Sequence, residues 1–262
     1  MDFLLGLLFT LLFVSDSKLV HSVNTTIMDS ALLLCRTSEK ITDLRNLRFY
    51  WQDDRKKVLY SFNKGEEMPG HISDRYLKRV SAFPQDMITG NISVLLNNLT
   101  LEDNGRIFEA YTTVFTGSET TILQTTQVCQ INLYVTVPYK DIRLAVHTDT
   151  MTSVCTVHGG FPAPEIYWTA HHNGSESLVD PRDVHTTTAQ DPESLLYTSS
   201  STLHIPAGPH QALTCLCHNP TLNATLNTTY TLSKGAAVWS LPGRSAGLTV
   251  AAALLLTALQ QL

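Results

Sequence analysis

The five cysteines are the residues whose chemistry this 262-residue sequence indicates most directly. Cys155 and Cys215 stand about 60 residues apart, with Trp168 between them. In a two-sheet β-sandwich, a cysteine on one sheet faces a cysteine on the other across the core, and a tryptophan packs on the bridge. We therefore predict a disulfide between Cys155 and Cys215. The alternative is two free thiols, which are uncommon in proteins of an oxidising, secretory compartment.

The other three cysteines leave their pairing open. Cys35 is followed by Trp51 at a similar spacing, but no cysteine stands where its partner is expected. Cys129 lies further along, on the same face of its strand as Ile131 by the alternation of strand side chains. A bridge shifted to Cys129 is one reading, and a buried thiol at Cys35 with Cys129 free or intermolecular is the other. Cys217 is unassigned, as the odd one of five.

Two patterns match catalytic or metal sites but lack the scaffold that such sites need. The segment Gly243–Gly247 (GRSAG) fits the G-x-S-x-G turn of serine hydrolases, yet it lies in the C-terminal tail without a flanking strand and helix. The adjacent rings of His171 and His172 diverge, and the pair Cys215-x-Cys217 has its first member committed to the core bridge. We predict no enzyme, no small-molecule substrate, no metal and no cofactor.

Charge and glycosylation motifs indicate a secreted or cell-surface protein. The formal net charge is -5, and no run of Lys or Arg offers a basic surface to nucleic acid, which excludes nucleic-acid binding.

Asn-x-Ser/Thr sequons mark acceptor sites for N-glycans in the secretory lumen. The predicted sites are Asn24, Asn91, Asn98, Asn173, Asn223 and Asn227.

The N-terminus has the pattern of a signal peptide. Residues 3–14 are an apolar block that is too short to span a bilayer and is followed at once by polar residues. We predict a signal peptide over residues 1–22, with Ser17 and Ser22 as the two candidate positions for the cut.

The C-terminus has the layout of a glycolipid-anchor signal. Three small residues begin at Gly235, a spacer follows, and residues 248–259 form an apolar tail. We predict an anchor signal over residues 234–262 with attachment at Gly235, and a C-terminal membrane segment is the alternative. Other residues that fit the attachment site are Ser233, Ser240 and Ser245.

Short strand-like runs dominate the rest of the chain. They are rich in Val, Ile, Thr, Tyr and Leu, are spaced about 8 to 12 residues apart, and do not alternate with helices. Pro138 interrupts a long strand, and a second set of strands begins at Ile142. We predict an all-β protein of two tandem immunoglobulin-like antiparallel β-sandwiches, variable-type over residues 23–137 and constant-type over residues 138–233.

The strand that lacks its cysteine needs a shifted register. In the undisturbed register Glu109 would point into the core beside Trp51, where an unpaired carboxylate costs several kcal/mol. A one-residue insertion places Phe108 and Ala110 inward instead. The insertion turns Glu109 outward. Every second residue after Glu109, beginning with Tyr111, faces outward as well.

Outward residues of the first domain's front sheet form the predicted binding surface. Because Trp51 faces the core, its neighbours on either side in the strand face outward. The predicted set is Arg48, Tyr50, Gln52, Tyr111 and Thr113. Aromatic and Arg side chains are frequent anchors of protein interfaces, although each alone is also an ordinary exposed residue. We also predict a structural ion pair between Arg79 and Asp103.

Several longer segments carry a resemblance to a known family. They are Phe49–Gln52 (FYWQ), Ser73–Arg79 (SDRYLKR), Asn91–Leu95 (NISVL), Gly160–Trp168 (GFPAPEIYW) and Cys215–Asn219 (CLCHN). In these segments the sequence resembles the costimulatory-ligand and butyrophilin immunoglobulin family, across both domains. The resemblance implies a variable-type domain that binds T-cell receptors of the costimulator class through its front sheet.

We predict a membrane-tethered ligand on the extracellular face of the plasma membrane. Its partner is a protein receptor on T cells, costimulatory or coinhibitory, bound through the front sheet of the first domain so as to modulate T-cell activation. The alternative is an immunoglobulin-fold adhesion molecule or decoy with no T-cell signalling role. A homodimer is compatible with either function.

Overall fold

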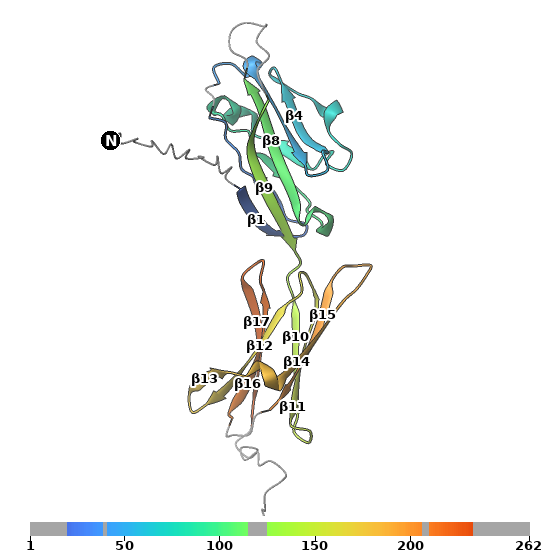
Figure 1. The fold of residues 1–262 in the computed structure, drawn as a ribbon, viewed down its shortest axis with the longest axis vertical. Helices are drawn as coiled ribbons and strands as arrows, with labels where there is room; N and C mark the ends of the chain where they lie inside the picture. The colour runs from blue at the N-terminus through green and yellow to red at the C-terminus, as the bar shows by residue number, and fades with distance from the viewer. Residues whose placement is uncertain (1–19, 39–40, 115–124, 206–209, 233–262) are drawn as a thin grey trace, which may run out of the picture. The chain divides into compact units, whose positions relative to one another are not determined.

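The computed structural model describes residues 20–38, 41–114, 125–205 and 210–232, and divides into two compact units between Thr136 and Val137. Strands and short 3₁₀ helices make up the regular structure of these ranges (Figure 1). The prediction of an all-β protein with two immunoglobulin-like domains is confirmed. In the described ranges, no helix is long and apolar enough to cross a membrane.

The first domain is a sandwich of two sheets. Its strands are β1 (Val20–Thr26), β2 (Ala31–Leu33), β3 (Leu47–Asp53), β4 (Val58–Asn63), β5 (Glu66–Glu67), β6 (Val80–Ala82), β7 (Val94–Leu96), β8 (Arg106–Val114) and β9 (Thr126–Thr136). The front sheet has the order β1-β9-β8-β3-β4-β5, and the back sheet has the order β2-β7-β6. β1 runs parallel to β9, whereas β8 pairs antiparallel with both β3 and β9.

The second domain contains two four-stranded sheets (Figure 1). Its strands are β10 (Asp141–His147), β11 (Thr152–Gly160), β12 (Glu165–His172), β13 (Ser175–Leu178), β14 (Val184–Gln190), β15 (Tyr197–His204), β16 (Ala212–Asn219) and β17 (Ala224–Thr231). One sheet has the order β10-β11-β15-β14, and the other has the order β13-β12-β16-β17. All of these neighbours pair antiparallel.

Short 3₁₀ helices occupy several of the connections. They are η1 (Leu44–Asn46), η2 (Pro69–His71), η3 (Pro84–Thr89), η4 (Leu101–Asp103) and η5 (Pro181–Asp183). η4 matters most for the first domain, because it precedes β8 and ends at the buried Asp103.

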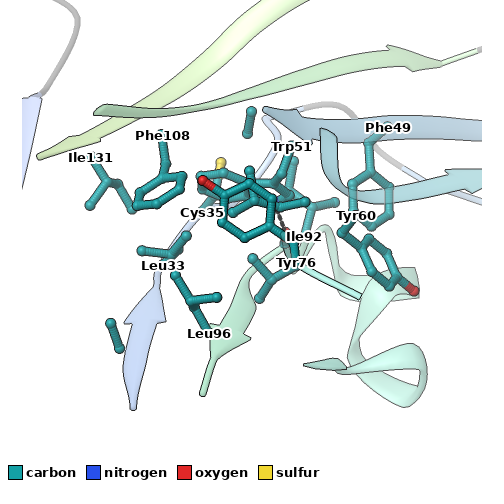
Figure 2. Packing of buried hydrophobic residues seen from close by; sticks show 14 of the residues in the cluster. Leu33, Cys35, Phe49, Trp51, Tyr60, Tyr76, Ile92, Leu96, Phe108 and Ile131 are labelled. Carbon is teal, nitrogen blue, oxygen red and sulfur yellow. Dashed lines mark hydrogen bonds between the residues drawn. The ribbon is translucent and has the colours of Figure 1, made fainter. Parts of the chain in front are cut away.

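The core of the first domain forms around Trp51, whose side chain is fully buried. Figure 2 shows it among Phe108 and Ile131 of the front sheet and Leu33 of the back sheet. The indole Nε1 donates a hydrogen bond to the carbonyl of Ile92 at 2.8 Å, so its polar atom is satisfied inside the core. Burial of a large apolar side chain stabilises the fold by about 1.5–3 kcal/mol.

The first-domain disulfide joins Cys35 to Cys129, with 6.0 Å between their Cα atoms, which is within the usual range for a bridge. Across the front sheet, Trp51 pairs with Ala110, and Ala110 pairs with Cys129. The small Ala110 side chain therefore occupies the position where the strand cysteine was expected. The bridge has moved to the directly opposite residue of the next strand.

The second-domain bridge joins Cys155 to Cys215, with 6.4 Å between the Cα atoms. Trp168 lies opposite Cys215 in the β12–β16 pairing and packs in the same buried cluster. Its Nε1 donates to Ser201 Oγ at 2.9 Å. Cys217 is free and buried beside Tyr139 and Val157.

Candidate functional site

The outward face of β3 and β8 brings most of the predicted binding residues together. The strand pairing sets Arg48 opposite Thr113, Tyr50 opposite Tyr111, and Gln52 opposite Glu109. Because side chains alternate along each strand, these three pairs share the face that lies away from Trp51. This face of the front sheet is the candidate site.

Tyr50 and Tyr111 form its centre. Their rings stack with centroids 5.1 Å apart and planes inclined by only 10°. Both side chains are half-buried, so the pair presents a rigid apolar surface that is partly open to solvent. An aromatic pair of this kind can anchor a protein partner at a low cost in conformational entropy.

Glu109 is the electrostatic centre of the face. Its Oε2 accepts hydrogen bonds from Lys56 Nζ at 3.1 Å, Gln52 Nε2 at 3.3 Å and the Tyr111 hydroxyl at 3.0 Å. Burial opposes ionisation of this carboxyl, but the three hydrogen bonds outweigh it and lower the pKa of Glu109. In its outward orientation, Glu109 therefore has three hydrogen-bond donors at Oε2.

Lys56 reaches Glu109 because a buried carboxylate holds the turn between β3 and β4. Asp53 Oδ1 accepts from the backbone N–H groups of Arg55 and Lys57, at 2.9 and 2.8 Å. Its Oδ2 accepts from the Tyr76 hydroxyl at 2.8 Å. Lys56 has a φ of 61°, in the left-handed region. Sequence reasoning did not identify Lys56, although the acidic residue two to four positions before an Arg-Lys-Lys run is a turn signal.

Thr113 does not extend the exposed surface as predicted. Its side chain is only 7% exposed, and its Oγ1 lies 3.0 Å from Thr125 Oγ1 at the start of the segment that leads into β9. The alternation of β8 places Thr113 on the predicted face, but its side chain is buried there. Arg48, opposite it on β3, is exposed.

The ion pair between Arg79 and Asp103 is part of a larger network. Asp103 is fully buried, and its Oδ2 accepts from Arg79 Nη2 at 2.6 Å while Oδ1 accepts from Arg75 Nη2 at 3.0 Å. The N–H of Thr100 also donates to Oδ2, at 3.0 Å. Burial raises the pKa of Asp103, but these bonds lower it by more. The second guanidinium was not foreseen from the sequence.

The predicted glycosylation sites lie at the surface with one exception. The asparagines with exposed side chains are Asn24, Asn98, Asn173, Asn223 and Asn227. Asn91 is half-buried, and its Oδ1 accepts a hydrogen bond from the N–H of Ser93 at 3.1 Å.

The two predicted processing signals lie largely outside the described residues. Residues 20–22, at the end of the predicted signal peptide, form the beginning of β1 and pair with β9. Gly235 and the rest of the predicted anchor signal fall in the range that the structure does not describe.

One family model and several curated proteins are similar to this chain in sequence. The family model for a CD80-like C2-set immunoglobulin domain matches residues 141–225, within the second domain. A CD276 antigen homolog from Xenopus laevis is 25% identical over 196 residues, covering 72% of this chain and 59% of the relative. Human T-lymphocyte activation antigen CD80 is 27% identical over 204 residues, covering 76% of this chain and 64% of the relative. The chain therefore spans less than two thirds of either relative.

A solved structure supports the two-domain fold. A chain of the crystal structure of ICOS in complex with ICOS-L and an anti-ICOS-L VNAR domain matches with a TM-score of 0.61 at 23% identity. The match covers 81% of this chain and 100% of that chain. The expectation of a non-enzymatic protein is confirmed, because these relatives are antigens and the family model describes an immunoglobulin domain.

Proposed function

We propose that this relative of the costimulatory ligands and butyrophilins is a cell-surface ligand for a costimulatory or coinhibitory receptor on T cells. The resemblance noted in the sequence is confirmed by the CD276 and CD80 relatives. A T-lymphocyte activation antigen among these relatives, and a solved complex of ICOS with ICOS-L among the structural neighbours, support this class of function.

The stacked pair of Tyr50 and Tyr111 is the observation that carries the proposal. Aromatic residues grouped on one face, half-buried and held rigid, have the properties of an interface anchor. Gln52 and Arg48 flank the pair with hydrogen-bond donors, and Lys56 adds an exposed cation. The receptor would therefore meet an apolar centre with a polar and basic rim.

Alanine substitution tests the front-sheet surface. The full-length chain is presented to cells that each display one T-cell surface receptor, and binding is measured by surface plasmon resonance for any receptor that responds. Tyr50→Ala and Tyr111→Ala should each cost about 2 kcal/mol, or roughly a 30-fold loss of affinity. Tyr167→Ala is the matched control, because Tyr167 is 44% exposed and lies on β12 of the second domain.

Two outcomes contradict the proposal. Full affinity in both front-sheet variants, with an unchanged circular dichroism spectrum, would exclude this surface. Binding to cell-surface proteins other than T-cell receptors would favour the adhesion or decoy alternative.

We also propose that the mature protein is tethered to the cell surface by a glycolipid at Gly235. The support is the order of small residues, spacer and apolar tail in residues 234–262. Phosphatidylinositol-specific phospholipase C should release the protein from intact cells. Retention of surface staining, with a known glycolipid-anchored protein released in parallel, would favour a membrane segment instead.

A further inference from the structure

A polar hollow of about 420 Å³ opens at the turn after β3 and the start of β8 in the first domain. Arg55, Arg75 and Arg106 line it, together with the carboxylates of Asp54 and Glu102. The backbone at Gly105 forms part of the wall, and a Cβ atom there would meet no other atom within 4 Å, so this side of the hollow is open.

The arginines of the hollow have hydrogen-bonding capacity that the described residues do not use. The Arg106 side chain is only 9% exposed, and its contacts are long: Nε to the Glu102 carbonyl at 3.3 Å and Nη1 to Asp54 Oδ1 at 3.4 Å. Arg75 Nε is buried without a partner in the described part of the chain. The two Nη atoms of Arg75 are paired with Glu102 and Asp103, at 2.9 and 3.0 Å, so only Nε of this guanidinium lacks a partner there. A buried donor without a partner raises the free energy of the empty site, because its desolvation is not repaid by a hydrogen bond.

Arg55 adds a third guanidinium at the open side. It is exposed, and within the described ranges its side chain makes no hydrogen bond or ion pair. Its backbone N–H is held by Asp53, which fixes the turn that carries it. The fold therefore sets the backbone position from which this cation extends, and its guanidinium is available to a ligand.

The two carboxylates at the rim of the hollow limit the kinds of molecule that it can bind. Asp54 and Glu102 are 40% and 75% exposed, so they can accept hydrogen bonds from a ligand while they repel a bare inorganic anion. The hollow is also several times larger than a sulfate ion needs. A ligand that combines one acidic group with hydroxyl groups satisfies both kinds of side chain.

We propose that this hollow binds an acidic sugar unit. Its carboxylate or sulfate group is held by the guanidinium groups of Arg55 and Arg106, which match oxyanions in a fork-like geometry. Its hydroxyl groups donate to Asp54 and Glu102. This site does not depend on receptor binding through the stacked tyrosines, so the two proposals stand or fall separately.

Two sources of such a sugar are distinguishable. One is a separate glycan, and the other is the chain's own N-glycan at Asn98. Asn98 lies near the network, because its carbonyl accepts from Arg79 Nη2 at 3.1 Å and Arg79 shares Asp103 with Arg75. Asn98→Gly removes the sequon without backbone strain, since Asn98 has a φ of 52°, where glycine is favoured.

Calorimetric titration of the purified full-length protein with glucuronic acid tests the site, with glucose as the neutral probe. We expect saturable millimolar binding of the acid alone, and Arg55→Gln should weaken it by about tenfold or more. Lys57→Gln is the matched control, because it removes a neighbouring exposed cation that does not line the hollow. Arg106→Lys keeps the positive charge but removes the planar guanidinium that can bind an oxyanion through two N–H groups. This variant should also bind glucuronic acid more weakly.

Binding is compared only among variants whose thermal unfolding midpoint is unchanged, so that a loss of binding does not reflect unfolding. Binding that appears only after the Asn98→Gly change indicates that the chain's own glycan fills the hollow. Binding in both forms indicates a separate glycan. The proposal is overturned if glucuronic acid does not bind either form, if glucose binds equally well, or if Arg55→Gln and Lys57→Gln have the same effect.

Discussion

The ring of Tyr111 stacks on the ring of Tyr50, with centroids 5.1 Å apart, while its hydroxyl donates to Glu109 at 3.0 Å. The aromatic centre of the front sheet is therefore oriented by a carboxylate that also receives Lys56 and Gln52. The Glu109 side chain therefore links the exposed aromatic pair to the charged Lys56 beside it.

Glu109→Gln should lower the free energy of unfolding by about 1 kcal/mol at pH 7, because the charge-assisted hydrogen bonds to the carboxylate are lost. The pKa of Glu109 is lowered in the folded state, so its contribution is present above its ordinary value of 4.5 and is lost as the pH falls through the folded value. Urea unfolding of both proteins at neutral and acidic pH checks this. A difference that persists undiminished in acid would contradict it, and Lys56→Gln should show the same pH trend.

Asp103→Asn should destabilise the first domain by about 3 kcal/mol, because it leaves the partly buried guanidiniums of Arg75 and Arg79 without their counter-charge. Thermal or urea unfolding measures the loss. Asp180→Asn is the control, since Asp180 pairs with Arg182 at the surface, and it should have no measurable effect. Equal losses in the two variants would refute a special role for the buried network.

Removing the Cys35–Cys129 bridge in the double alanine variant should cost about 2–5 kcal/mol of stability. The bridge closes a chain segment with a sequence separation of 94, and opening it increases the freedom of the unfolded state. Peptide mapping without reduction should recover Cys35 and Cys129 linked within one chain. A dimer on a non-reducing gel that disappears in Cys129→Ala would indicate an intermolecular bond instead.

Cys217 should resist alkylation in the folded protein. Burial raises the pKa of its thiol to about 11, so the thiolate that reacts is scarce at neutral pH and is also shielded. Iodoacetamide without reductant should label Cys217 only after unfolding in urea, as read by mass spectrometry. Rapid labelling of the native protein would show that the thiol is accessible, and Cys217→Ser supplies the blank.

Glycan occupancy should be lowest at Asn91. Its amide is half-buried and its Oδ1 is engaged by the Ser93 N–H, whereas Asn98 on the other side of β7 is exposed. Glycopeptide mass spectrometry of protein from a secretory host measures both sites. Full occupancy at Asn91 would mean that the sugar is added before this part of the domain folds.

The sequence by itself determined the features that follow from local alternation and spacing. Period-two patterning assigns Trp51 to the core and Tyr50 to the opposite face, and the cost of burying a lone carboxylate turns Glu109 outward. The spacing of Cys155, Trp168 and Cys215 indicates a sandwich, and the predicted bridge between Cys155 and Cys215 is present.

Only the tertiary structure decided the features that depend on how distant strands and turns align. Cys35 pairs with Cys129 because the strand register sets Cys129 opposite Ala110, and a register shift follows at once between Ala110 and Tyr111. Lys56 reaches Glu109 only through the turn that Asp53 holds. Thr113 is buried and its hydroxyl contacts Thr125, a residue outside its own strand. Each of these relationships is non-local, and alternation along one strand carries no information about what lies across from it or over it.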